Sequence, residues 1–276
     1  MNQPPSWQVG CELAFSVEER AEIALQIAVA ATPGRTVADR LDVTLDGRPI
    51  SGEVREVGGP HGGRIHHLES PPGQLEVTYR ATASGLATGA DPAGDEAYQR
   101  LLALRPSRYC PSDALLGFAA GQLGDRDPGA DLVRDVVAWV SNRIVYAPGS
   151  SGPLDTAVDT LLAGQGVCRD FAHLGVGLSR AVGVPARLVS AYAPGLSPMD
   201  FHAVVEAHVD GGWHVFDPTH LAPRASLLRI ATGRDAADTA FADVLSGIAT
   251  LTRMEVGAVF GGCLPLDDWG ALVHIP

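Results

Sequence analysis

Apolar and polar residues alternate along several short runs in the first third of the chain. One run, "CELAFSV", begins at Cys11, and another, "GQLEVTYRATA", begins at Gly73. A period of two is typical of strands with one buried face. Between them, "LDVTLDGRPI" contains Asp46-Gly47, a dipeptide that favours a tight hairpin turn. Residues 16–31 also contain good helix formers, but we favour strand there, so the sequence predicts a mainly β N-terminal domain.

The pattern changes after "ATASGLATGADPAGDEAY", a stretch of glycine and small residues near residues 82–98. This composition is typical of a linker. We therefore predict an N-terminal β domain over residues 1–90 and a second domain over residues 91–276. Apolar residues then recur every three or four positions in "ALLGFAAGQLG" and "LVRDVVAWVSNRIVY", which predicts helices. Ser112 and Asp113 are candidate caps of the first helix.

A third helical pattern follows the glycine-rich stretch "GQGVCRDFAHL" and begins near Cys168. Phe171, Leu174 and Leu178 would form its apolar face, and Gly183 would end the helix. Cys168 then lies in the first turn, where unpaired N–H groups and the helix dipole favour a thiolate. A free cysteine is usually a small buried side chain. The position indicates a nucleophile without excluding that ordinary role.

The segment "DFHAVVEAHVDGGWHVFDPTHL" predicts a hairpin. If Asp210-Gly211 forms its turn, Asp217 lies opposite Val204 and one diagonal step from His202, within side-chain reach. A turn one residue later would carry Asp217 too far along the hairpin. We therefore predict the Asp-Gly register.

These three side chains match a known chemistry. A cysteine attacks an acyl carbon, a histidine takes the thiol proton and returns it to the leaving group, and a carboxylate orients the imidazole. Cys168, His202 and Asp217 would supply these groups. Alternatively, His202 is a surface histidine of a strand and Asp217 only starts a turn. A zinc site at Cys168 would match no common ligand spacing, so we expect no metal and no cofactor.

At these residues the chain resembles the transglutaminase-like superfamily, and its bacterial cysteine peptidases in particular. The matching stretches are "RPSRYCPSD", "GQGVCRDFAHL", "GVPARLVSAYA", "DFHAVVEAHVDGGWHVFDPT" and "RIATGRDAADTAF". The resemblance implies an α+β fold, in which a papain-like core packs the nucleophile helix on an antiparallel sheet, preceded by a mainly β N-terminal domain. Carried over by motif, the triad is again Cys168, His202 and Asp217. Many relatives have an aromatic residue where this chain has Val204.

Transition-state stabilisation requires hydrogen-bond donors for the developing oxyanion. The backbone N–H of Cys168 is one candidate. The side chain of Tyr146 or Gln165 is a candidate for the second donor, although each also fits a structural role.

Composition and charge limit the kinds of partner expected for this chain. The formal net charge is −12, from 20 basic and 32 acidic residues, and no basic run is present. Nucleic-acid binding is therefore not expected. The apolar runs are short and broken, and the N-terminus lacks the pattern of a signal peptide, so neither membrane insertion nor secretion is expected. Four widely spaced cysteines predict no disulfides in a reducing compartment. We expect a soluble, cytoplasmic protein.

The function that fits best is a thiol-dependent amide hydrolase, a cysteine peptidase that acts on a peptide or protein through a thioester. A first alternative is an acyl transferase, in which an amine resolves the thioester and cross-links or joins substrates. A second alternative is a non-catalytic binding module with the same fold, although such a module has no need of all three side chains. The sequence leaves the physiological substrate and the oligomeric state, including homo-oligomers, open.

Overall fold

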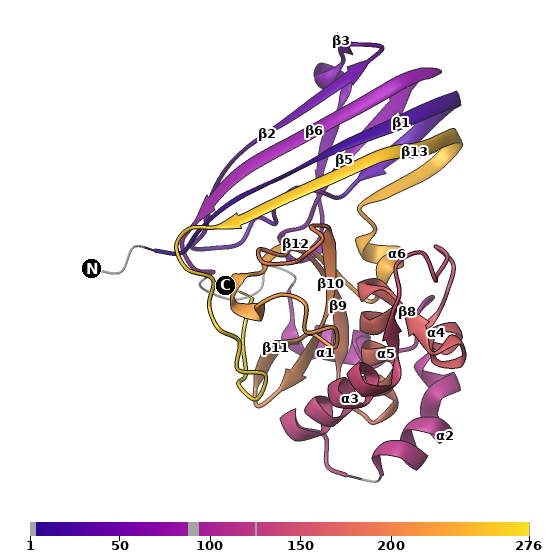
Figure 1. Cartoon of the computed structure of the whole chain (residues 1–276), viewed down its shortest axis with the longest axis vertical. Coiled ribbons are helices and arrows are strands. Elements are labelled where there is room, and N and C mark those ends of the chain that lie inside the picture. Colours follow the sequence, from indigo (N-terminus) through magenta and orange to yellow (C-terminus); the bar gives the residue numbers. More distant parts are fainter. Residues whose placement is uncertain (1–3, 88–93, 125, 276) are drawn as a thin grey trace.

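An antiparallel sheet built from both ends of the chain lies above a smaller sheet that is packed with helices (Figure 1). The structure is a computed structural model, and it describes residues 4–87, 94–124 and 126–275. The linker predicted over residues 82–98 falls partly outside the described residues, which do not include 88–93. None of the described helices is long and apolar enough to cross a membrane.

The first sheet has seven strands in the order β3-β2-β6-β1-β5-β4, and β13 also pairs with β1. Its strands are β1 (Ser6–Leu25), β2 (Thr36–Leu45), β3 (Arg48–Pro49), β4 (Arg55–Gly58), β5 (Arg64–Ser70), β6 (Gly73–Ser84) and β13 (Ala242–Phe260). Two short 3-10 turns, η1 (Ser51–Glu53) and η2 (Pro60–Gly62), lie in its connections. Burial alternates along most of β1. The choice of strand over helix is therefore confirmed up to Leu25.

The hairpin predicted at Asp46-Gly47 joins β2 to β3. Asp46 has a φ of 48° and Gly47 a φ of 75°. A two-residue turn with this twist needs a positive φ at both central positions, and Asp-Gly adopts such angles at low cost.

Strand β13 overturns part of the predicted division of the chain. It runs antiparallel to β1 from the pair Trp7–Phe260 to the pair Leu25–Ala242. The prediction that residues 91–276 form one catalytic core is therefore wrong for Ala242–Phe260. The physical reason is that β1 would otherwise present a long row of unpaired backbone groups. The sequence of β13 indicates a strand but does not specify its partner.

The second part of the molecule contains a four-stranded antiparallel sheet in the order β11-β10-β9-β12, covered by helices. Its strands are β9 (Ala186–Tyr192), β10 (Phe201–Val209), β11 (Gly212–Phe216) and β12 (Leu228–Gly233). The helices are α1 (Glu96–Leu102), α2 (Ser112–Leu123), α3 (Ala130–Arg143), α4 (Ala157–Ala163), α5 (Cys168–Ala181) and α6 (Ala236–Thr239). The short strands β7 (Val145–Tyr146) and β8 (Gln165–Gly166) pair in parallel, and a 3-10 turn, η3 (Arg224–Ser226), precedes β12.

Helix α5 is the central helix of this part. Apolar side chains of α5, including Ala172 and Val176, pack against Val205 and Ala207 of β10. Helices α2, α3 and α4 surround it (Figure 1). The predicted capping of α2 by Ser112 or Asp113 is wrong, because the helix begins at Ser112 after Pro111 and has no side-chain cap.

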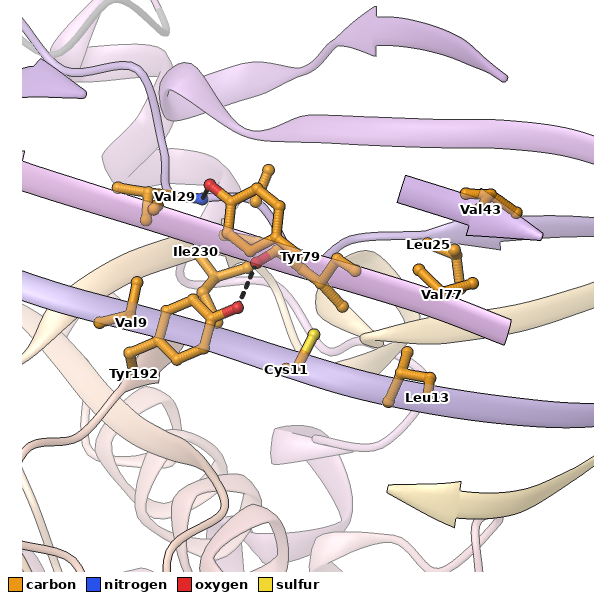
Figure 2. Close-up of a cluster of buried hydrophobic side chains, with 14 of the residues drawn as sticks. Val9, Cys11, Leu13, Leu25, Val29, Val43, Val77, Tyr79, Tyr192 and Ile230 are labelled. Atoms are coloured by element: carbon orange, nitrogen blue, oxygen red, sulfur yellow. Dashed lines mark hydrogen bonds between the residues drawn. The ribbon is translucent and has the colours of Figure 1, made fainter. Parts of the chain in front are cut away.

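The two parts share one apolar core. Tyr192 of β9 stacks on Tyr79 of β6 with 6.5 Å between ring centroids, and its hydroxyl donates to the carbonyl of Ile27 at 2.8 Å. Figure 2 shows both tyrosines among buried side chains of the first sheet. Tyr192 is also the register partner of Phe201, the first residue of β10. The first sheet therefore supports the start of β10, where His202 directly follows Phe201.

Candidate active site

The start of α5 is fixed by the side chain of Asp170. This buried carboxylate accepts a hydrogen bond from the Val167 N–H at 2.8 Å and another from the Ser151 hydroxyl at 2.5 Å. Gly166 allows the close approach, because a Cβ there would lie 2.6 Å from the Asp170 Cβ. Cys168 is the first residue of the helix, as the sequence predicted. It is only partly buried, unlike Cys11 and Cys110.

The hairpin has the predicted Asp-Gly register. Asp210 and Gly211 have φ values of 51° and 81°, and Val209 pairs with Gly212 across the turn. Because Asp217 directly follows β11, this register brings its carboxylate to His202. The His202 Nε2 lies 2.8 Å from the Asp217 Oδ2, and both side chains are fully buried.

Thr219 holds the other oxygen of this carboxylate. Its backbone N–H and its hydroxyl donate to Asp217 Oδ1 at 2.9 Å and 2.7 Å. Burial raises the pKa of Asp217, but the charge of His202 and the hydrogen bonds from His202 and Thr219 hold it below the ordinary value. The sequence analysis did not identify Thr219, although a hydroxyl two residues after an aspartate is a common turn signal.

Cys168 and His202 contact each other at the start of α5. The Cys168 Sγ lies 3.8 Å from the carbonyl oxygen of Phe201. Burial lowers the pKa of His202, but the charge and hydrogen bond of Asp217, followed by the effect of the neighbouring Cys168, outweigh it and raise the pKa to about 10. His202 Nε2 is committed to Asp217, whereas the buried Nδ1 has no hydrogen-bond partner among the described residues. Nδ1 is thus the nitrogen left for the thiol.

The two oxyanion candidates differ in position. Tyr146 lies beside Cys168, and its pKa is raised to about 12, chiefly by burial and then by the charges of Cys168 and Asp200. The side chain of Gln165 is exposed, and its backbone pairs with Val145 in the short β7–β8 ladder. Tyr146 therefore lies next to the nucleophile, whereas Gln165 faces solvent.

Glu206, on the same strand as His202, belongs to a separate ion-pair network. It lies 2.7 Å from Arg187 and 2.6 Å from Arg229. Burial raises the pKa of Glu206, but the two arginines outweigh this and hold it far below its ordinary range. Arg187 also lies over the ring of Trp213, 3.8 Å from its centroid. Glu206 is thus bound to arginines and does not orient His202.

Histidines outside this constellation make structural contacts. His173 accepts a hydrogen bond from the Ala236 N–H at 3.1 Å and stacks on Tyr109. Burial lowers its pKa to about 4, which favours the neutral ring. Over the described ranges, no group of three or more histidine, cysteine, aspartate or glutamate side chains has the geometry to hold a metal ion.

Comparison with known proteins identifies the family. A model described as the transglutaminase-like superfamily matches residues 117–218. The crystal structure of "a Putative Cysteine Protease from Cytophaga hutchinsonii" is 30% identical, with a TM-score of 0.86 over 98% of this chain and 96% of that one. The chain therefore belongs to the transglutaminase-like superfamily. This confirms the predicted α+β fold with a mainly β N-terminal region.

Curated relatives come from mycobacteria. An uncharacterized protein of Mycobacterium leprae is 29% identical over 149 residues, which is 50% of this chain and 52% of the relative. An uncharacterized protein of Mycobacterium tuberculosis is 29% identical over 176 residues, which is 57% of this chain and 55% of the relative. The chain thus spans about half the length of the curated relatives it matches.

Proposed function

We propose that this chain is a cysteine-dependent amide hydrolase, a peptidase that acts through Cys168, His202 and Asp217. The observation that carries the proposal is a single imidazole held between two partners. Its Nε2 lies 2.8 Å from the Asp217 carboxylate, and Cys168 lies close enough to the ring to contribute to its raised pKa. A nucleophile, its base and an orienting carboxylate within hydrogen-bond reach are the signature of covalent acyl catalysis.

In the first half-reaction, Nδ1 of His202 takes the thiol proton and the Cys168 sulfur attacks the carbonyl carbon of the amide. The carbonyl π electrons move to oxygen. When the tetrahedral intermediate collapses, the C–N bond breaks and the imidazolium donates its proton to the departing amine. Asp217 stays ionised throughout and stabilises the imidazolium, in accord with its lowered pKa. The product is a thioester on Cys168.

In the second half-reaction, water attacks the thioester while His202 takes one of its protons. The C–S bond then breaks, the acid product leaves, and the proton returns to sulfur. The Cys168 N–H and the Tyr146 hydroxyl lie beside the thiol and are our candidates for the oxyanion donors. If an amine replaces the water, the same site forms a new amide, which is the acyl-transfer alternative.

The test is incubation of the whole chain with a diverse peptide pool, with and without a primary amine, followed by mass spectrometry. We expect cleaved peptides that disappear with Cys168→Ala and persist with Cys263→Ala, a matched change at an exposed cysteine. Amine incorporation without cleavage would establish acyl transfer instead. If wild type neither cleaves a peptide nor incorporates the amine beyond what Cys168→Ala does, and Cys168 is never acylated, the proposal is wrong and the binding module is favoured.

A further inference from the structure

Asp200 lies at the mouth of the candidate site, in the loop between β9 and β10. Its Oδ1 accepts a hydrogen bond from the Phe201 N–H at 2.7 Å. The carbonyl oxygen of the same residue, Phe201, lies 3.8 Å from the Cys168 Sγ. The carboxylate of Asp200 is therefore anchored to the residue that borders the nucleophile, although Asp200 itself is exposed to solvent.

This carboxylate influences both functional neighbours. Partial burial raises the pKa of Asp200, against the opposing effects of the Phe201 N–H and the charge of His202. Its charge in turn contributes to the raised pKa of Tyr146. A substrate placed between Tyr146 and His202 would therefore encounter the field of Asp200.

Among the described residues no arginine forms a salt bridge with Asp200, and the positive charge that acts on its carboxylate is that of His202. Arg169, the cation that follows the nucleophile on α5, donates instead to the Gly152 carbonyl at 2.6 Å and to Asp170 at 2.8 Å. A carboxylate attracts cations at short range even where water reaches it. An incoming cation would therefore find an anchored carboxylate, with no arginine partner among the described residues, close to the thiol.

We propose that Asp200 forms a cation-binding subsite, which selects substrates that carry a lysine or arginine side chain next to the acyl group attacked by Cys168. This inference rests on the proposed function, since it assigns the charge class of the substrate of that site. The group bound by Asp200 would be an alkylammonium or a guanidinium. It could belong to a side chain of the substrate, or to a free primary amine that acts as the acyl acceptor.

The first arm of the test uses two thiol reagents of similar size and opposite charge, trimethylammonioethyl and sulfonatoethyl methanethiosulfonate. Their rates at Cys168 are measured by mass spectrometry in wild type, Asp200→Asn and Asp243→Asn. Asparagine retains an oxygen for the Phe201 N–H, so the loop is conserved. Asp243 is the matched control, because it also has a raised pKa from partial burial but belongs to β13.

We expect the cation-to-anion rate ratio to fall by about fivefold in Asp200→Asn, as the loss of one charge several ångströms from the thiol would give. In Asp243→Asn the ratio should stay within about twofold of wild type, because Asp243 lies on β13 opposite Ala24 of the first sheet and not in the loop that borders the thiol. An unchanged ratio in Asp200→Asn would overturn the subsite whether or not the protein is an enzyme.

The second arm uses peptides that differ only in lysine, glutamine or glutamate beside the cleaved bond. Wild type should favour lysine over glutamate by at least about fivefold in kcat/KM, and Asp200→Asn should lose this preference. Equal cleavage of all three peptides by wild type, together with amine incorporation that is unchanged in Asp200→Asn, would refute the subsite and leave the proposed function intact. If no peptide is cleaved or acylates Cys168, the proposed function fails and the substrate assignment fails with it.

A dansylated primary amine distinguishes the two sources of the cation. If amine incorporation falls in Asp200→Asn while the peptide preference is absent in wild type, the subsite binds the acceptor amine. A loss of peptide preference in Asp200→Asn with no effect on amine incorporation supports the substrate side chain.

Discussion

Replacing Asp217 by asparagine changes one oxygen of a buried carboxylate to an amide nitrogen and keeps the size of the side chain. The surroundings decide which way the amide faces. The Thr219 N–H and hydroxyl both donate to Asp217 Oδ1. An amide nitrogen at that position would face a backbone donor, so the amide oxygen must stay on the Thr219 side.

The amide nitrogen then faces Nε2 of His202, which is 2.8 Å from the second carboxylate oxygen in wild type. An NH2 group donates, so Nε2 must accept and the single ring proton moves to Nδ1. Nδ1 is the nitrogen left for the Cys168 thiol, and in its protonated form it cannot take the thiol proton. The variant therefore stabilises the wrong tautomer.

A wrong tautomer at this position costs about 10⁴-fold in turnover in other triad enzymes, or about 5 kcal/mol of barrier. We expect a loss of this order for Asp217→Asn, together with about 1–3 kcal/mol of stability from the altered buried hydrogen bonds. Turnover is measured on a peptide identified from the pool, and stability by denaturant unfolding followed by circular dichroism.

Asp235→Asn is the matched control, because Asp235 is also buried but accepts from the Tyr109 and Ala237 N–H groups and does not touch His202. It should lose similar stability and keep its turnover. If Asp217→Asn retains turnover within about tenfold of wild type while folded, the tautomer argument is refuted and Asp217 is not the orienting group.

Three further predictions concern reactivity, metal and pH. Limiting iodoacetamide should modify Cys168 ahead of exposed Cys263 and of buried Cys11 and Cys110. Burial raises the thiol pKa of both buried cysteines, that of Cys11 to about 12. Equal labelling of all four cysteines in the native protein would contradict this prediction. Activity should survive EDTA, since thiol and imidazole supply nucleophile and base, and loss of activity that zinc restores would argue for a metal. Because the pKa of His202 is about 10 when folded and 6.5 is its ordinary value, its contribution to stability should be full below pH 6.5 and lost as pH rises toward 10, by up to about 1.4 kcal/mol per pH unit. Denaturant unfolding of Cys168→Ala, which keeps the effect of Asp217 and loses that of Cys168, should show a decline that ends at a lower pH, and a flat profile would contradict the effect of Asp217 on this pKa.

Much of the candidate site followed from local sequence signals. Alternating side chains and an Asp-Gly turn set the register of the β10–β11 hairpin, because a turn residue with positive φ fixes which positions face each other. The glycine-rich start of α5 placed Cys168 at a helix N-terminus for the same local reason. These signals placed Asp217 beside His202 and Cys168 at a helix start, and the resemblance to the family joined the three residues in one triad.

Only the tertiary structure decided the partners of these elements. Periodicity tells which face of a strand is buried but not against what, so it could not pair β13 with β1 or exclude Ala242–Phe260 from the core. Glu206 reads as a second carboxylate near His202 in the sequence, and only the fold brings Arg187 and Arg229 to it. Likewise, which of the described arginines could reach Asp200 depends on where their side chains point, which is a property of the packed molecule and not of any local stretch of sequence.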